Sequence, residues 1–422
     1  MYSVSGTICE SSTEYIELDN VSLNGSKISK KLYIVVNNNF EIDTIVKGRM
    51  LLNFVANNPN IDMRLRHCSV NYFATATANS GEIEVVGHTK TLNGFFKGIR
   101  KTLQDKLEDL FGANSNIISL ILLAKASSEI DYDTLSNIRN SGIAHLFALS
   151  GLHIAIFAWV LMLVLKRLPP LVKYSILTVF LVVYTAVAGF PPSLVRSQIM
   201  SLFIFSADVF TRRNDTLTSL SASLILMLFI NPFQIFSVGL LLSFFAVLGL
   251  LLLTNPLQAL LAPFLDRKLS TTILSTVSAT LCTFPISAYF FKSVQVYSII
   301  TNIIAIPISS VSLIAAFIGT LVGFVSETLA FPFVFVANTT MDAVLIVSDG
   351  IAKMPFATVA VDSMPIFSVV FFYLAMFAVS DYFIVDTNIL VDNSKILKYK
   401  MKISAMFIGA CVFSAAFAWL FV

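Results

Sequence analysis

From Gly142 to the C-terminus, apolar stretches of membrane-spanning length follow one another along the chain. A helix needs about 20 apolar residues to cross the hydrocarbon core of a bilayer. Ten segments meet or approach this length: 143–166, 171–190, 197–211, 216–230, 235–254, 270–291, 296–325, 329–348, 365–385 and 404–421. We therefore predict a polytopic α-helical membrane bundle of about ten spans over residues 142–422, in which some of the shorter spans are broken or interfacial.

Charged residues are concentrated before this region. Residues 1–142 carry 29 of the 53 charged side chains, and the much longer remainder carries 24. The chain as a whole is 13% charged, against roughly 25% in ordinary soluble proteins. The first part is thus charged like a soluble domain, whereas the second is too apolar for a soluble core of its size. The net charge of +3 does not by itself indicate a nucleic-acid partner.

Residues 1–92 are predicted to form a small all-β domain. Short runs rich in β-branched and aromatic residues alternate with polar turns such as Asn24-Gly25. The expected strands are Tyr2–Cys9, Glu14–Leu23, Lys31–Val36, Val46–Val55, Met63–Ala74 and Glu82–Val86. Five or six short strands in this length favour a small barrel, for which an OB-like fold is the natural candidate.

Residues 93–141 are predicted to be helical and to connect this domain to the membrane part. Over 93–111 the apolar residues recur at steps of three and four, which indicates an amphipathic helix. The stripe consists of Phe96, Ile99, Leu103, Leu107 and Leu110. Such a helix either lies in the bilayer interface or caps the strand domain, and the sequence leaves both alternatives open.

The distribution of Lys and Arg predicts the topology. With ten spans, and the loop of Lys166 and Lys173 in the cytoplasm, eleven basic residues after Gly142 lie inside and three lie outside. The domain of residues 1–142 is then outside the cytoplasm, although its N-terminus does not resemble a signal peptide. Either upstream membrane segments are missing from the given sequence, which we favour, or the topology is wrong.

The densest group of polar residues in the apolar region lies in its first segment. His145 and His153 are eight residues apart, about two turns, so an unbroken helix would place them on nearly one face. Ser150 and Gly151 between them are expected to kink or unwind that helix. A Ser nucleophile with a His base and a metal site are the alternatives to a structural or pore-lining role. Because the segment has no Asp or Glu and the chain has no HExxH, we predict no catalytic residue, metal or cofactor.

Further polar and helix-breaking residues interrupt the later apolar segments. Arg196 either extends to the interface or projects into a polar pathway, where a phosphate or carboxylate would meet it. Pathway candidates besides the first cluster are Arg196, Gln198, Ser243 and Asn302. Helix-break candidates are Pro192, Pro232, Pro285 and Pro307. Broken helices around a cavity are typical of channels and transporters.

The four cysteines show no metal-binding spacing. Cys282 and Cys411 lie in apolar runs and are expected to be core thiols. Cys9 and Cys68 lie in the soluble part and would form a disulfide if that part is outside the cytoplasm.

Residues 145–153, His-Leu-Phe-Ala-Leu-Ser-Gly-Leu-His, resemble the defining motif of the ComEC competence-protein family. Three further segments match that family in the same order: the Pro192–Arg196 segment, the Asn231-Pro232 to Ser243 segment, and the Pro285–Asn302–Pro307 segment. The resemblance spans roughly residues 1–310 and is most specific in the first motif.

The resemblance implies a multi-pass protein of the bacterial inner membrane that passes single-stranded DNA into the cytoplasm during natural transformation. It also implies an OB-fold outside the cytoplasm after upstream membrane helices, and further uptake machinery as partners. Many members carry a metallo-β-lactamase-like nuclease domain, but this chain has no H-x-H-x-D-H run. We therefore expect no enzyme activity from this chain and a separate nuclease or helicase as its partner. A homo-oligomer is compatible with the sequence.

Aromatic residues of the first domain are candidates for stacking on bases, although a core role is the more common one. They are Tyr2, Tyr15, Tyr33, Phe40, Tyr72 and Phe73. Two other functions stay open: a small-molecule transporter with a soluble accessory domain, and an intramembrane hydrolase that uses Ser150 and a histidine.

Overall fold

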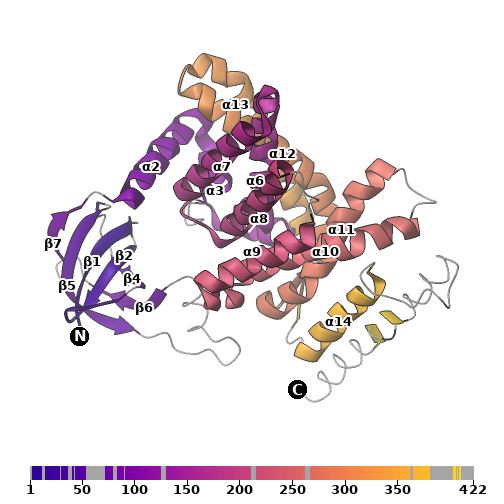
Figure 1. Cartoon of the computed structure of the whole chain (residues 1–422), viewed down its shortest axis with the longest axis horizontal. Helices are drawn as coiled ribbons and strands as arrows, with labels where there is room; N and C mark the ends of the chain where they lie inside the picture. The colour runs from indigo at the N-terminus through magenta and orange to yellow at the C-terminus, as the bar shows by residue number, and fades with distance from the viewer. Residues whose placement is uncertain are drawn as a thin grey trace.

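The computed structural model describes most of the chain up to residue 380. Within residues 2–380 it leaves out 12–14, 29, 37–39, 42, 54–71, 79–82, 90, 125–129, 211–214, 262–266 and 362–364, and beyond them it describes 403, 404, 406, 408 and 409. Figure 1 shows a β-domain at the N-terminus, a long helix that leaves it, and a large assembly of helices.

The N-terminal strands form a small closed barrel. They are β1 (Tyr2–Ser11), β2 (Tyr15–Leu23), β3 (Ser26–Lys27), β4 (Lys31–Val35), β5 (Thr44–Asn53), β6 (Tyr72–Thr77) and β7 (Ile83–His88). Hydrogen bonds run in the order β1-β2-β4-β6-β5, and β5 pairs back onto β1, which closes the ring. The β4–β6 pair is parallel, the other pairs of the ring are antiparallel, and β7 extends the sheet beside β5.

Alternation of side chains along each strand builds the core of the barrel. On β4, Leu32 and Ile34 are fully buried inside, whereas Tyr33 points outward. The strands predicted within residues 2–53 and 82–86 are confirmed to within a few residues. The predicted strand Met63–Ala74 lies mostly outside the described residues, and β6 continues from Tyr72 to Thr77.

Helix α2 (Leu92–Phe111) connects the barrel to the helical bundle, and Asp43 holds its first turn. The Asp43 carboxylate accepts hydrogen bonds from the Thr91 backbone N (3.1 Å) and from Thr91 Oγ1 (2.5 Å). Thr91 is the N-cap of α2, and its Oγ1 accepts from Gly94 N at 3.0 Å. A Cβ on Gly94 would lie 1.7 Å from Asp43 Oδ2, so any other residue here would displace the Asp43 carboxylate.

The stripe predicted on α2 packs against the bundle. Phe96, Ile99, Leu103 and Leu110 contact the same core that buries Leu107. Helix α2 docks along α3, α7, α12 and α13. Neither of the two predicted roles, lying in the bilayer interface or capping the strand domain, describes this packing by itself. The position of the membrane surface relative to α2 stays a prediction.

The bundle consists of helices of very different lengths. They are α3 (Ser115–Leu123), α4 (Tyr132–Asn140), α5 (Ala144–Phe147), α6 (Gly151–Val164), α7 (Pro170–Val187), α8 (Pro192–Val209), α9 (Thr216–Ile230), α10 (Val238–Leu261), α11 (Arg267–Phe291), α12 (Ser298–Gly323), α13 (Glu327–Ala352) and α14 (Ile366–Val379). A short two-stranded antiparallel sheet of β8 (Ser293–Gln295) and β9 (Thr358–Ala360) joins the segment before α12 to the segment after α13.

Five helices in the described part of the chain are long and apolar enough to cross a bilayer. These segments are Pro170–Val187, Val238–Ala259, Ile273–Phe291, Ser298–Gly323 and Glu327–Ala352. Three shorter apolar helices are Gly151–Val164, Thr216–Ile230 and Phe367–Val379. The prediction of a helical membrane bundle behind a small β-barrel is confirmed, but the count of about ten spans is not. Most of the predicted span 404–421 lies outside the described residues.

Helices α12 and α13 form a hairpin with an extensive contact between the two helices. Small residues line its contact: Ala316 and Ala337 are fully buried, and a Cβ on Gly319 would lie 3.2 Å from Phe333 Cβ. Small side chains let membrane helices approach closely, which gains dispersion energy that lipid cannot supply. The α12–α13 pair thus forms a surface on which α2, α3, α4 and α6 pack.

Candidate polar site at the broken first helix

The chain leaves the helical conformation between Phe147 and Gly151. Helix α5 ends at Phe147, Ala148 has ψ 133°, and Ser150 has φ −136° and ψ 179°, so the backbone is extended before α6 begins. The predicted unwinding at Ser150-Gly151 is confirmed. Non-helical backbone at membrane depth is tolerated only beside protein or water. The break therefore needs polar partners.

Ser150 and His153 satisfy the new helix end by a reciprocal cap. The Ser150 backbone N donates to His153 Nδ1 at 3.2 Å, and Ser150 Oγ lies 3.3 Å from the same nitrogen. In return, the Ser150 side chain accepts from the backbone of His153, as in a capping box. His153 is 2% exposed and replaces the Glu or Gln that usually fills this position.

The two histidines of the motif lie in different environments. His145 is exposed on the four-residue helix α5, whereas His153 is buried in α6. Because the chain is extended between α5 and α6, the two histidines do not share the face of one helix. A void of about 10 Å³ beside His153, also lined by Ser309 and Ser310, has roughly the size of one water molecule.

Arg196 on α8 reaches across to α10 and lies against the start of α6. It is 3% exposed, so it does not extend to the surface of the bundle. Its Nη1 donates to the backbone O of Ser243 at 3.0 Å, and its Nη2 donates to Ser197 Oγ at 3.2 Å. A Cβ on Gly151 would lie 3.6 Å from Nη2 and 2.8 Å from Ser197 Oγ. Gly151 thus permits the close contact of α6 with α8.

Two serines that the sequence reasoning missed complete this contact. Ser193 Oγ donates to the Leu149 backbone O at 2.6 Å, which satisfies a carbonyl freed by the break. Ser197 Oγ donates to Ser193 O at 2.9 Å. The four-residue spacing of Ser193 and Ser197 places both on one face of α8. This spacing on either side of Arg196 is the sequence signal that could have identified the two serines.

The structure brings together Ser150, Gly151, His153, Arg196 and Ser243, but not every candidate. Gln198 is buried elsewhere on α8, two positions beyond Arg196. Asn302 is 3% exposed on α12, and its Oδ1 has no hydrogen-bond partner within the described structure. We find no contact of either residue with the Arg196 guanidinium among the described contacts.

The four prolines divide into two pairs. Pro192 is the first residue of α8, and Pro232 begins the 3₁₀ helix Pro232–Phe236 that separates α9 from α10. Pro285 and Pro307 lie inside α11 and α12, which continue through them. Helix breaks at the latter two positions are therefore wrong in this structure. Membrane helices tolerate such prolines because neighbouring groups satisfy the freed carbonyls.

Cys9 lies on the barrel, and the predicted disulfide partner Cys68 is outside the described residues. Cys9 is 4% exposed, and its Sγ lies 3.9 Å from Glu17 Oε2. Burial raises the pKa of the Cys9 thiol to about 11, which the nearby Lys31 and Lys97 charges only partly offset. The Cys9–Cys68 pairing stays a prediction. No cluster of metal-ligating side chains occurs within the described part of the chain.

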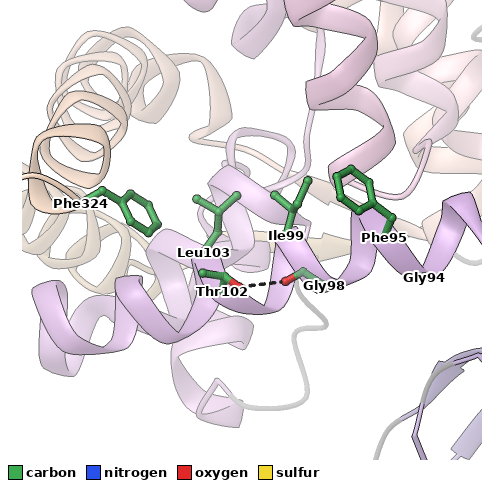
Figure 2. Close-up of a pocket in the computed structure, with 7 residues that line it drawn as sticks. All are labelled: Gly94, Phe95, Gly98, Ile99, Thr102, Leu103 and Phe324. Carbon is green, nitrogen blue, oxygen red and sulfur yellow. Dashed lines mark hydrogen bonds between the residues drawn. The ribbon is translucent and has the colours of Figure 1, made fainter. Parts of the chain in front are cut away.

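An open groove lies apart from the motif residues, along α2. It has a volume of about 560 Å³ and is lined by Gly94, Phe95, Gly98, Ile99, Thr102, Leu103 and Phe324. Figure 2 shows these α2 side chains in a row, with Phe324 from the end of α12 at one end of the groove. Thr102 Oγ1 donates to Gly98 O at 3.1 Å, so its hydroxyl is turned onto its own helix and the groove is mainly apolar.

Comparisons with known proteins locate the family. The model of the family "Competence protein" matches residues 122–382. The chain is similar to ComE operon protein 3 of Bacillus subtilis (strain 168), with 27% identity over 244 residues, which cover 57% of this chain and 30% of that protein. The match thus spans less than a third of that relative. No solved structure matches significantly. Because the family model covers more than half of the chain and includes α5, α6, α8 and α10, the chain belongs to the competence protein family.

Proposed function

We propose that this protein is the membrane channel through which single-stranded DNA enters the cytoplasm during natural transformation. The observation that carries the proposal is the family match over residues 122–382. This range contains the broken helix at Ser150 and the buried Arg196. Non-helical backbone and a buried cation inside a membrane bundle are features of permeation pathways.

The topology of the barrel supports an OB-like assignment for the first domain. Its ring of five strands contains one parallel pair, β4–β6, between the third and fifth strands of the ring in chain order. OB-folds are five-stranded barrels that bind oligonucleotides on one face. We assign that role to the outer face of β2, β4 and β6.

Three tyrosines on this outer face support binding of a single strand. The Tyr15 and Tyr33 rings are stacked with centroids 4.8 Å apart, and Tyr72 meets Tyr33 edge-on at 6.3 Å. All three are partly exposed, so they belong to the surface and not to the barrel core. Aromatic side chains of this kind stack on bases with little dependence on sequence.

The arrangement of Ser150 and His153 supports a role without catalysis. His153 Nδ1 accepts a hydrogen bond from the Ser150 backbone N, so the lone pair that a general base would use is occupied. The pair caps α6, and this alone accounts for both side chains. We therefore propose that the chain is not an enzyme and that a separate nuclease or helicase processes the DNA.

We also propose the finer localisation and assembly. The barrel lies outside the cytoplasm, the bundle lies in the bacterial inner membrane, and the pathway is completed by other uptake proteins or by a second copy of the chain. The Lys and Arg bias of the loops supports this orientation.

The test is DNA entry in cells that lack this gene. We expect labelled DNA to stay bound outside while cytoplasmic single-stranded DNA and transformants disappear, and expect both to return with the wild-type gene. An Arg139→Gln variant, changed at an exposed residue of α4, should complement fully. Unchanged DNA entry in the deletion strain would refute the proposal, and a small-molecule transporter would become the working hypothesis.

A further inference from the structure

Within the described part of the chain, the positive charge of Arg196 has no counter-charge. Its hydrogen-bond acceptors are the Ser243 backbone O, Ser197 Oγ and, more weakly, Met200 Sδ at 3.9 Å, all of them neutral. Its Nε is buried and has no acceptor within the described structure, where no carboxylate makes an ion pair with the guanidinium. Burying a cation without a partner costs free energy, and the cost is greater inside a membrane bundle than inside a protein surrounded by water.

The start of α6 brings a second positive group to the same place. Helix α6 has 14 residues, and the N-terminus of such a helix carries about half a positive charge. The Ser150–His153 cap satisfies two amides, while those of Gly151 and Leu152 have no acceptor inside the helix. Since Nη2 of Arg196 lies beside Gly151, two positive groups lie close together, an arrangement that a bound anion would stabilise.

We propose that Arg196 and the first turn of α6 form a binding site for a phosphate group. Guanidinium groups bind phosphate through paired hydrogen bonds, and helix N-termini bind it through backbone amides. The site is reached from the broken segment, where Ala148 is exposed and Ser150 and Gly151 are only half-buried. Gly151 lets the guanidinium approach the first turn of α6, because a Cβ there would clash with Ser197 Oγ at 2.8 Å.

The phosphate belongs to the backbone of the translocated strand, and this identification rests on the proposed function. A phosphate contact is independent of base sequence, as a channel for any DNA requires. Two of the guanidinium donors already bind the Ser243 backbone O and Ser197 Oγ. Arg196 therefore binds each phosphate weakly and can release it as the strand moves. A phospholipid headgroup has the same chemistry and is distinguished by experiment.

The site itself is tested with the full chain in nanodiscs of phosphatidylcholine, using inorganic phosphate as the probe. Phosphate, compared with chloride at equal ionic strength, should raise the melting temperature of the wild-type protein by about 2 °C or more. Arg139→Gln should show the same rise, Arg196→Lys a smaller one, and Arg196→Gln none. An equal rise in Arg196→Gln, or no rise in the wild type, would overturn the site.

A second arm identifies the source of the phosphate. Binding of a thymidine decamer with a normal phosphodiester backbone is compared with a decamer whose linkages are uncharged methylphosphonates. Arg196→Gln should weaken the charged decamer about tenfold and leave the uncharged one unchanged. If phosphate stabilises the protein but Arg196→Gln leaves the charged decamer unaffected, the DNA assignment fails while the anion site stands. Stabilisation by phosphatidylglycerol that Arg196→Gln abolishes would then assign the site to lipid.

Discussion

The guanidinium of Arg196 on α8 donates a hydrogen bond of 3.0 Å to the backbone carbonyl oxygen of Ser243 on α10. The two residues are 47 positions apart, and each lies in a separate segment of polar residues within apolar sequence. Through this contact the break in front of α6, the α8 helix and the α10 helix become one structural unit.

Replacing Ser150 by Ala should weaken the protein without abolishing DNA entry. The change removes the cap of α6, which costs about 1 kcal/mol of the free energy of unfolding. Ser150→Asp should retain most of that stability because its carboxylate can accept the same hydrogen bond. Thermal unfolding of the two variants in nanodiscs, with DNA entry measured in parallel, checks this. Complete loss of function in a stable, correctly inserted Ser150→Ala protein would instead favour the hydrolase hypothesis.

Replacing Gly94 by Ala should weaken the connection between the barrel and the helical bundle. A Cβ on Gly94 would overlap the Asp43 carboxylate, so Gly94→Ala should cost about 1–3 kcal/mol and loosen the start of α2. Gly98→Ala is the matched control, because a Cβ there meets no atom within 4 Å. It should be neutral or stabilise the helix by up to about 1 kcal/mol. Hydrogen exchange of α2 in both variants provides the measurement, and equal protection would show that Asp43 does not hold this turn.

Tyr33 should contribute to DNA binding by the barrel. It contacts both Tyr15 and Tyr72, so Tyr33→Ala should weaken binding of an oligothymidine by about tenfold, on the order of 1–3 kcal/mol per stacked base. Tyr33→Phe keeps the ring and should bind almost like the wild type. Tyr132→Ala, at an exposed tyrosine of α4, is the control for a surface aromatic outside the barrel. Fluorescence anisotropy with the full chain measures all three, and unaltered affinity in Tyr33→Ala would remove the tyrosine face from the binding site.

The Cys9 thiol should resist alkylation in the reduced native protein. Its pKa is raised to about 11 by burial, so near pH 8 the thiolate fraction is well below that of an ordinary cysteine. Because the thiolate is the nucleophile, reaction with iodoacetamide should be slow before denaturation, fast after it, and should accelerate as the pH rises toward that pKa. Rapid labelling of the folded protein near pH 8 would contradict the buried position.

Mass mapping under non-reducing conditions tests the Cys9–Cys68 disulfide. Export of the barrel predicts a peptide pair that joins the two residues and separates on reduction. Two free thiols in protein purified without reductant would dismiss the pairing.

Local pattern determined most elements of this protein before the structure was known. The alternation in Lys31–Val35, the apolar stripe of α2 and the long runs that became α10 to α13 each require only neighbouring residues, because strand and helix periods act over a few positions. The break at Ser150-Gly151 was predicted for the same reason. The short helix α9 matches the predicted segment 216–230. The shortness of α6 was not predicted, since composition shows where a run is apolar but not where its helix ends.

Tertiary structure alone decided which polar groups meet. Asn231 before Pro232 and Pro191 before Pro192 mark helix starts locally, but nothing local shows that α11 and α12 continue through Pro285 and Pro307. Closure of the barrel through β1 and β5, and the contact of Arg196 with Ser243, join residues 38 or more positions apart. Such contacts depend on how whole helices and strands pack, since burying a polar group is favourable only where the fold supplies its partner. The sequence by itself thus determined the elements, and packing determined the site.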